Sequence, residues 1–275
     1  MVPVYILDDE SPGEFAMGAA SRWWLHHSLR RLNEALDGRL IIVRGNAAKL
    51  IPTLVADTGA KRVYWNRGYE PWQIRRDRWI KKTLRDGGVT AESYGGTLLF
   101  EPQSVMKADG TPYRVFTPFY RKGCLQNMPA PRLPLAAPDI RLADQKVVGA
   151  TVDSLELLPG IEWYQGIDAE WSPGEAGATK RLEAFLSDGL AHYKEGRNLP
   201  DKPYVSRLSP HLHFGELSPN QAWYAAGDAD APEADVDHFR SELGWRDFSY
   251  YLLYHFPELP RTNFQKKFDR FPWHD

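Results

Sequence analysis

A short loop in the second half of the chain carries groups that can bind phosphate. Val205-Ser206-Arg207-Leu208-Ser209-Pro210 offers two hydroxyls, several backbone N–H groups and a guanidinium just before a predicted helix. Donors of this kind at a helix start suit a phosphate or pyrophosphate. Ser209 followed by Pro210 predicts an N-cap and a first helical turn. A capped helix with a solvated Arg207 accounts for the same residues, so the loop alone leaves both interpretations open.

A second segment has the side chains that a nucleobase site needs. Glu242 and Trp245 are three residues apart on a predicted helix, so they share a face. A carboxylate beside an indole can hydrogen-bond the edge of a base and stack on its ring. Arg246 stands at the i+4 position from Glu242, and an exposed ion pair between these two residues is the structural alternative.

Residues 1–100 alternate short apolar segments with amphipathic ones. Strands are predicted at Val2–Leu7, Leu40–Arg44, Arg62–Trp65 and Val89–Tyr94, and helices at Ser21–Leu36, after an Asn46 cap, and at Pro71–Asp86. This alternation indicates a parallel sheet covered by helices. Ligands of such sheets bind beyond the carboxyl ends of the strands, which here carry Asp8-Asp9-Glu10, Gly45-Asn46 and residues 66–70. No glycine-rich phosphate fingerprint is present, which disfavours a dinucleotide-dependent oxidoreductase.

The second half of the chain has a different pattern. Residues 101–165 are rich in proline and weakly periodic, which predicts a long connector. Helices are predicted over Thr179–Tyr193, from a capping box at Ser218 with Pro219 in the first turn, and over Val236–Tyr254. The second half is therefore expected to be all-helical.

Composition sets broad limits on function. The 275 residues carry a net charge of -2, which leaves a local nucleic-acid-binding patch possible. Aromatic residues make up 13%, a surplus that suits a planar cofactor or stacked bases. The lone Cys124 excludes an internal disulfide, and no apolar run is long enough to span a membrane. We expect a cytoplasmic monomer without membrane association. His211 and His213 have no third metal ligand, so we expect a core or first-turn histidine and no metal.

Several motifs, in this order along the chain, resemble the photolyase/cryptochrome family. They are Gly110–Tyr120, Trp171–Glu175, Tyr193 with Arg197, Val205–Gly215 and Glu242–Phe248. The first resembles the antenna-domain motif and the second the entry to the helical domain. The match runs over essentially the whole chain and is most like a bacterial cyclobutane pyrimidine dimer photolyase. Gly244 stands where a larger apolar residue is common in the family, which costs some helix propensity.

The resemblance implies an α/β chain of three parts. These are an N-terminal parallel-sheet, Rossmann-like antenna domain over residues 1–125, a connector over 126–166, and an all-helical FAD-binding domain over 167–275 that is incomplete. The family's first strand should precede Val2, and further flavin-pocket helices should follow Asp275. We therefore expect a fragment that binds FAD weakly or not at all.

The resemblance also implies roles for individual residues. FAD is expected to contact Tyr193, Val205, Ser206, Arg207, Leu208 and Ser209. Arg197 matches a DNA-backbone contact, and the segment that faces DNA comprises Glu242, Leu243, Gly244, Trp245, Arg246, Asp247, Phe248 and Ser249. Within it, Glu242 and Trp245 match the residues against the flipped-out pyrimidine dimer. Trp273 matches the outermost tryptophan of the electron-transfer chain.

The implied function is light-driven repair of cyclobutane pyrimidine dimers by electron transfer from reduced FAD, with damaged DNA as the partner. A cryptochrome-type photoreceptor and an inactive truncated product are the alternatives. Glu242 with Trp245 favours repair, because a sensor does not need that pair. A second antenna chromophore, a folate or a deazaflavin, is also implied. Gln73, beside Trp72, stands where a folate would need a carboxylate, which weakens the folate interpretation.

Overall fold

The computed structural model of the chain describes residues 1–143 and 149–272. The strands are β1 (Val4–Leu7), β2 (Ile41–Arg44), β3 (Arg62–Asn66) and β4 (Thr90–Tyr94). β1 pairs with β2, and β3 pairs with β4, both in parallel, with Val4 opposite Ile41 and Arg62 opposite Thr90. The predicted parallel pairing is confirmed, but the four strands form two two-stranded sheets where the alternation suggested a single sheet.

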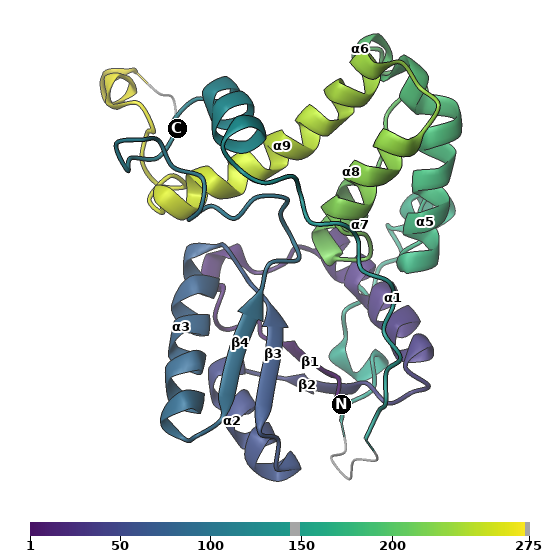
Figure 1. Ribbon diagram of the computed structural model, residues 1–275. Coiled ribbons are helices and arrows are strands. Elements are labelled where there is room, and N and C mark those ends of the chain that lie inside the picture. The colour runs from purple at the N-terminus through teal and green to yellow at the C-terminus, as the bar shows by residue number, and fades with distance from the viewer. Residues whose placement is uncertain (144–148, 273–275) are drawn as a thin grey trace.

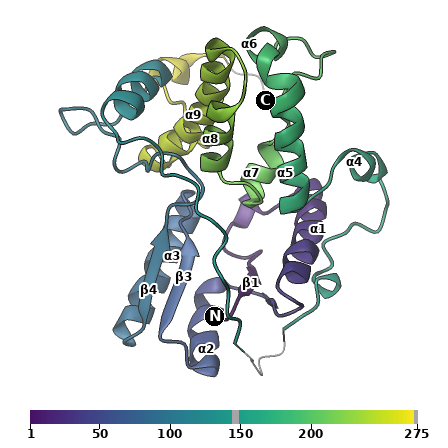
Figure 2. The ribbon, with the colours of Figure 1, turned by 45° about the vertical axis from the view of Figure 1, so that its right-hand side comes forward.

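Three helices connect these strands, namely α1 (Ala19–Ala35), α2 (Ala47–Thr58) and α3 (Pro71–Asp86). The side chain of Asn46 accepts hydrogen bonds from the amides of Ala48 and Lys49, so the predicted cap of α2 is confirmed. Figures 1 and 2 show α2 and α3 beside the β3–β4 sheet, whereas α1 lies beside α5 and α7 of the helical part. α1 therefore brings the α/β part against the helices of the second half.

The second half is helical, as predicted. Its α-helices are α4 (Gln165–Glu170), α5 (Glu175–Ala184), α6 (Tyr193–Gly196), α7 (Ser209–Phe214), α8 (Pro219–Asp228) and α9 (Glu233–His255). The capping box at Ser218 is confirmed, with Gln221 as its partner. The single helix expected over Thr179–Tyr193 is wrong, because α5 ends at Ala184 and wider and tighter turns lead to α6.

Shorter helical turns complete the chain. π-helical turns span Pro118–Gln126 and Phe185–Gly189, and 3₁₀ turns span Gly13–Phe15, Asp153–Leu155, Leu190–His192 and Lys266–Arg270. The helix at Pro118–Gln126 lies within the segment expected to be a connector. Its aromatic and cysteine side chains, Phe119, Tyr120 and Cys124, are buried.

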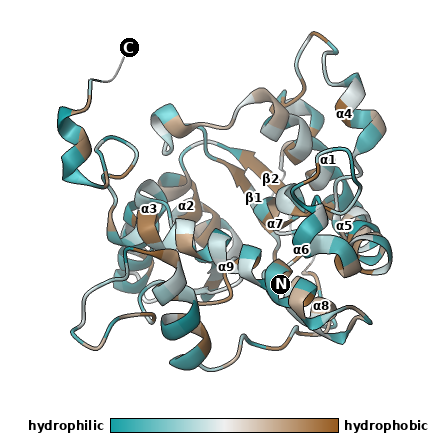
Figure 3. Ribbon diagram, turned by 90° about the horizontal axis from the view of Figure 1, so that it is seen from above, coloured by the Kyte–Doolittle hydropathy of each residue, from teal (hydrophilic) through white to brown (hydrophobic). Residues whose placement is uncertain are grey.

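The largest apolar core lies in the helical part. It combines side chains of α5, α8 and α9 with Leu99, Phe100, Val105 and the helix at Pro118–Gln126. A second core packs β1 and β2 against α1, and a third packs β4 against α3. Figure 3 shows β1 and β2 as largely apolar strands. Residues 99–124 thus pack with the helices, while the domain boundaries at 125 and 166 stay a prediction.

No helix within residues 1–143 and 149–272 is long and apolar enough to cross a membrane.

Candidate functional site

An ion pair between Arg197 and Glu242 joins the end of α6 to the middle of α9. Both side chains are only about a quarter exposed (28% and 29%), and the hydrogen bond that Arg197 donates to Glu242 raises the pKa of Arg197. The alternative pair of Glu242 with Arg246 does not form in the structure, because Arg246 donates to the carbonyl oxygens of Thr97 and Leu212. The carboxylate of Glu242 is therefore a hydrogen-bond acceptor held beside the cationic guanidinium of Arg197.

Trp245 lies on the same face of α9 and is 45% exposed. One face of its indole stacks on Phe116, with ring centroids 3.7 Å apart and planes 12° from parallel. The exposed surface therefore belongs mainly to the other face, on which a second planar ring can stack. Sequence reasoning missed Phe116 as a site residue. Its place within the Gly110–Tyr120 motif was the only signal.

The rest of the segment from Glu242 to Ser249 divides between core and surface. The buried side chains or positions are Leu243, Gly244, Asp247 and Phe248. Ser249 is exposed, and its hydroxyl donates to the carbonyl oxygen of Trp245. Direct contact with a molecule outside the helix is therefore open to Glu242, Trp245, Arg246 and Ser249.

Asp247 anchors α9 to the segment after β4. Its Oδ2 accepts from the backbone amides of Leu99 and Phe100, each at 2.9 Å. Its Oδ1 forms no hydrogen bond with any described residue, and Arg246 Nη1 lies 4.0 Å away. Burial raises the pKa of Asp247 to about 7. These contacts give Asp247 a structural role.

The loop of residues 205–209 presents free donors. No acceptor in residues 1–143 or 149–272 takes a hydrogen bond from the hydroxyl of Ser206 or of Ser209. The predicted N-cap at Ser209 is wrong, because Leu208 is the N-cap and Ser209 is the first residue of α7. The Ser209 hydroxyl is therefore not used for capping. Val205 is exposed and Leu208 is buried.

Arg207 is exposed, as the alternative of a solvated side chain requires, and it makes two contacts at the surface. Its φ of 53° lies in the left-handed region, which is uncommon for a residue with a Cβ. The guanidinium pairs with Glu170 at 3.4 Å and lies 4.6 Å from the ring centre of Trp171. The loop backbone is thus bent sharply where it precedes α7.

Tyr193 lies at the start of α6 and is buried against Phe185 and Phe239. Burial raises the pKa of its phenol to about 12. The hydroxyl therefore stays protonated near neutral pH and can donate a hydrogen bond.

A buried polar triad joins α1 to α7. Glu216 Oε1 accepts from Trp24 Nε1 at 3.0 Å, and Glu216 Oε2 lies 2.6 Å from His211 Nδ1. His211 is 1% exposed, which confirms the core interpretation of this histidine. The triad lies just after the loop of residues 205–209, so it ties that loop's helix to the α/β part. No group of three or more His, Cys, Asp or Glu side chains in the described ranges could hold a metal ion.

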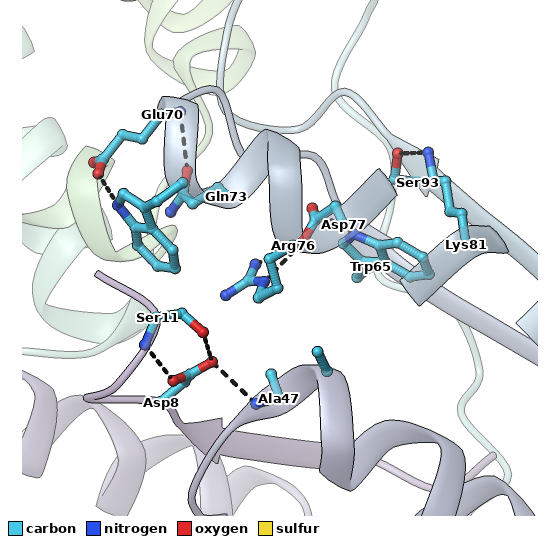
Figure 4. A network of polar contacts seen from close by, with 12 residues as sticks. Asp8, Ser11, Ala47, Trp65, Glu70, Gln73, Arg76, Asp77, Lys81 and Ser93 are labelled. Carbon is cyan, nitrogen blue, oxygen red and sulfur yellow. Dashed lines mark hydrogen bonds and ion pairs between the residues drawn. The ribbon is translucent and has the colours of Figure 1, made fainter. Parts of the chain in front are cut away.

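The strand ends carry a separate polar network, shown in Figure 4. After β1, Asp8 accepts from the Ser11 hydroxyl and from the amide of Ala47. Burial opposes ionisation of Asp8, yet these hydrogen bonds leave its pKa below the usual value. The Arg76 guanidinium lies between this loop and α3, bonded to Asp77 and 5.0 Å from the Trp72 ring centre.

The side chain of Gln73 takes part in the capping box at the start of α3. Its Oε1 accepts from the backbone amide of Glu70, and the Trp72 indole donates to the Glu70 carboxylate. Gln73 therefore acts in helix capping. Trp273 lies outside the described residues, so its predicted electron-transfer role stays a prediction.

Comparison with known proteins places these features in one family. The DNA photolyase family model matches residues 1–139. The chain is 41% identical to a deoxyribodipyrimidine photo-lyase of Agrobacterium fabrum, over 100% of this chain and 58% of the relative. It is 30% identical to cryptochrome-1 of Arabidopsis thaliana, over 99% of this chain and 42% of the relative.

A solved structure shows the same relationship. The crystal structure of a bacterial class III photolyase from Agrobacterium tumefaciens superposes with a TM-score of 0.91 at 39% identity. That match covers 100% of this chain and 57% of the photolyase chain. The chain thus spans less than two thirds of these relatives. The motif resemblance, the fold and the family model agree, and the chain belongs to the DNA photolyase family.

Proposed function

We propose that this chain carries part of a site for the light-driven repair of cyclobutane pyrimidine dimers in DNA. The observation that carries the proposal is the Arg197–Glu242 ion pair beside the exposed indole face of Trp245. The pair supplies a charged acceptor and a charged donor, and the indole supplies a flat apolar surface. A flipped-out pyrimidine is read through its edge and its ring face in this way.

The chemistry of the pair fits a thymine edge. An ionised Glu242 accepts the imide N–H of thymine, while Arg197 can donate to a base carbonyl or to a nearby phosphate. A dimer is already poorly stacked in the duplex, so extruding it costs less than extruding an undamaged base. The lower cost of extrusion therefore favours the damaged bases, and Glu242 and Trp245 hold the bases once they are extruded.

The loop of residues 205–209 fits the phosphates of FAD. Ser206 and Ser209 have free hydroxyls, and the backbone turns through the left-handed region at Arg207 between them. Tyr193 can donate a further hydrogen bond. When bound, reduced FAD would supply the electron that splits the dimer. The chain's own residues orient the dinucleotide and hold the lesion, and we propose Tyr193, Val205, Ser206, Arg207, Leu208 and Ser209 as FAD contacts.

The proposed DNA contacts are Arg197 and the accessible part of the segment on α9, namely Glu242, Trp245, Arg246 and Ser249. The buried members of that segment, such as Asp247, would act by fixing the helix. We also propose that a second chromophore, a folate or a deazaflavin, binds at the strand ends near Trp72 and Arg76. The Trp72 ring provides a stacking surface there, and Arg76 provides a cation.

Binding of defined oligonucleotides tests the repair proposal. The chain is expected to bind a single-stranded oligonucleotide that contains one thymine dimer more tightly than the same undamaged sequence, as measured by fluorescence anisotropy. Equal affinities would contradict it. FAD titration in the same samples tests the flavin site, and the absence of any detectable binding would contradict the proposed FAD contacts.

The alternative of a cryptochrome-type photoreceptor is favoured by the 30% identity to cryptochrome-1 of Arabidopsis thaliana. A full-length homologue that retains DNA only when dimers are present would support repair. A homologue that ignores dimers would support the photoreceptor.

A further inference from the structure

Three aromatic rings form a parallel stack that runs from the core to the surface. Phe116 stacks on Trp245 at 3.7 Å and on Tyr120 at 5.3 Å, with interplanar angles of 12° and 10°. Two rings cannot share one face of Phe116 at these distances without overlapping, so Phe116 lies between them. Tyr120 is 3% exposed and Trp245 is 45% exposed. The stack therefore has a buried end and a free end.

The buried end rests on the backbone of α9. A Cβ added to Gly244 would lie 2.5 Å from both Cδ2 and Cε2 of Tyr120, which is far inside van der Waals contact. Gly244 is therefore required for the Tyr120 ring to reach this position. Gly244 and Trp245 are consecutive residues. α9 therefore contacts Tyr120 at the buried end of the stack and provides the indole of Trp245 at its exposed end.

Phe116 and Tyr120 belong to one short segment of the chain. Phe116 lies two residues before the helix Pro118–Gln126 and Tyr120 lies in its first turn, and their rings stack on each other. Phe248 packs edge-on against Phe116, with ring centroids 5.8 Å apart, and limits sideways movement of the Phe116 ring. The plane of the Trp245 indole is thus set by a ring that is itself held on two further sides.

From this geometry we propose that Phe116 is a positioning residue for Trp245, with Tyr120 and Gly244 holding Phe116 in place. The proposal rests on the proposed function for the claim that a damaged base stacks on the free indole face. An indole fixed in advance binds a ring without first losing rotamer freedom, so its affinity for the base is higher. Phe116 touches neither DNA nor FAD in this proposal and acts only through Trp245.

The test compares Phe116→Leu, which removes the ring, with Phe116→Tyr, which keeps it. Phe15→Leu serves as the control, because Phe15 is 52% exposed and lies in a separate 3₁₀ turn. Two readouts are taken for each variant. The first is the ratio of affinities for dimer-containing and undamaged oligonucleotides. The second is acrylamide quenching of Trp245, obtained by subtracting the matching variant that also carries Trp245→Phe.

We expect Phe116→Leu to lower the affinity ratio by about fivefold, a part of the roughly tenfold or larger loss expected when Trp245 itself is replaced by Leu. Quenching of Trp245 should rise because both indole faces become accessible. Phe116→Tyr and Phe15→Leu should match the parent chain in both readouts. An unchanged ratio and unchanged quenching in Phe116→Leu would overturn the proposal.

The two readouts also separate this proposal from the repair function. If the parent chain shows no preference for dimers, the proposed function fails, and the quenching readout alone decides whether Phe116 positions Trp245. If the parent prefers dimers and Phe116→Leu changes quenching without changing the ratio, the role in base stacking is refuted. If Phe116→Tyr also lowers the affinity ratio and raises the quenching of Trp245, the site tolerates no change of volume at position 116. That result would refute a role specific to the aromatic ring.

Discussion

Arg197, at the end of α6, is paired with Glu242 in the middle of α9, forty-five residues further along the chain. The pair joins two helices, of which only α9 was predicted from the sequence. Glu242 does not form the alternative ion pair with its local neighbour Arg246. The guanidinium of Arg246 instead donates to the backbone carbonyl oxygens of Thr97 and Leu212. The charge of Glu242 is therefore balanced by Arg197, which we propose as a DNA contact.

The first prediction concerns Glu242→Gln. The amide keeps the shape but loses the charge, so the bond to the base imide and the pair with Arg197 both weaken. A hydrogen bond to a charged group contributes about 1.5–3 kcal/mol, so the preference for dimer-containing DNA should fall by about tenfold or more. The ratio of affinities is the right measure, because removing one negative charge also strengthens non-specific binding to phosphates.

Glu233→Gln is the matched control, since Glu233 is exposed in the first turn of the same helix. It makes the same change of charge outside the proposed site. A preference that survives Glu242→Gln unchanged would show that the carboxylate has no part in reading the lesion.

The second prediction concerns the pH dependence contributed by Asp247, whose pKa burial raises to about 7 from 3.8. A carboxyl group with a raised pKa in the folded state binds its proton more tightly there than in the unfolded state. Its contribution to stability is therefore fully present below about pH 4 and is lost as the pH rises to about 7. The loss is at most about 4 kcal/mol for this shift.

Asp247→Asn isolates this contribution, because the amide oxygen can still accept from the amides of Leu99 and Phe100. Urea unfolding of both proteins between about pH 5 and 8 should show the stability of Asp247→Asn rising relative to the parent as the pH increases. A difference that stays constant over this range would mean that Asp247 does not titrate there.

These residues also show how far the sequence alone could go. The period of apolar residues and the caps at Asn46 and Ser218 correctly placed most helices, because those signals are local. Pairing of Glu242 with Arg197 is not local, and the i+4 neighbour Arg246 offered a closer alternative. The burial of Asp247 could not be foreseen either, because its partners are backbone amides 147 and 148 residues away. Division of the strands between two sheets likewise depends on tertiary contacts.

The third prediction concerns the triad of Trp24, Glu216 and His211. Glu216→Ala leaves the Trp24 N–H and the His211 ring nitrogen buried without their partner, which should cost about 3 kcal/mol or more in unfolding free energy. Trp24→Phe removes a single donor and should cost about 1 kcal/mol from the hydrogen bond. Urea-induced unfolding measures both.

Glu183→Ala, at an exposed position on α5, is the control and should change stability by less than about 0.5 kcal/mol. If Glu216→Ala unfolds at the same urea concentration as Glu183→Ala, the triad does not hold α7 against α1.

The fourth prediction concerns Gly244→Ala in the middle of α9. In an exposed helix this exchange stabilises by about 1 kcal/mol, because alanine has the higher helix propensity. Here the new methyl group would lie 2.5 Å from two ring carbons of Tyr120. Overpacking of this kind typically costs about 1–3 kcal/mol, so the variant should be less stable than the parent despite its better propensity.

Gly166→Ala provides the comparison, because Gly166 lies in α4 and a Cβ there would meet nothing within 4 Å. It should be neutral or slightly stabilising in urea unfolding. Since Tyr120 transmits its position to Phe116 and hence to Trp245, Gly244→Ala should also raise acrylamide quenching of Trp245, whereas Gly166→Ala should not. Gly244→Ala that gains stability and leaves quenching unchanged would show that the Tyr120 ring moves aside freely, and that the stack is not fixed from its buried end.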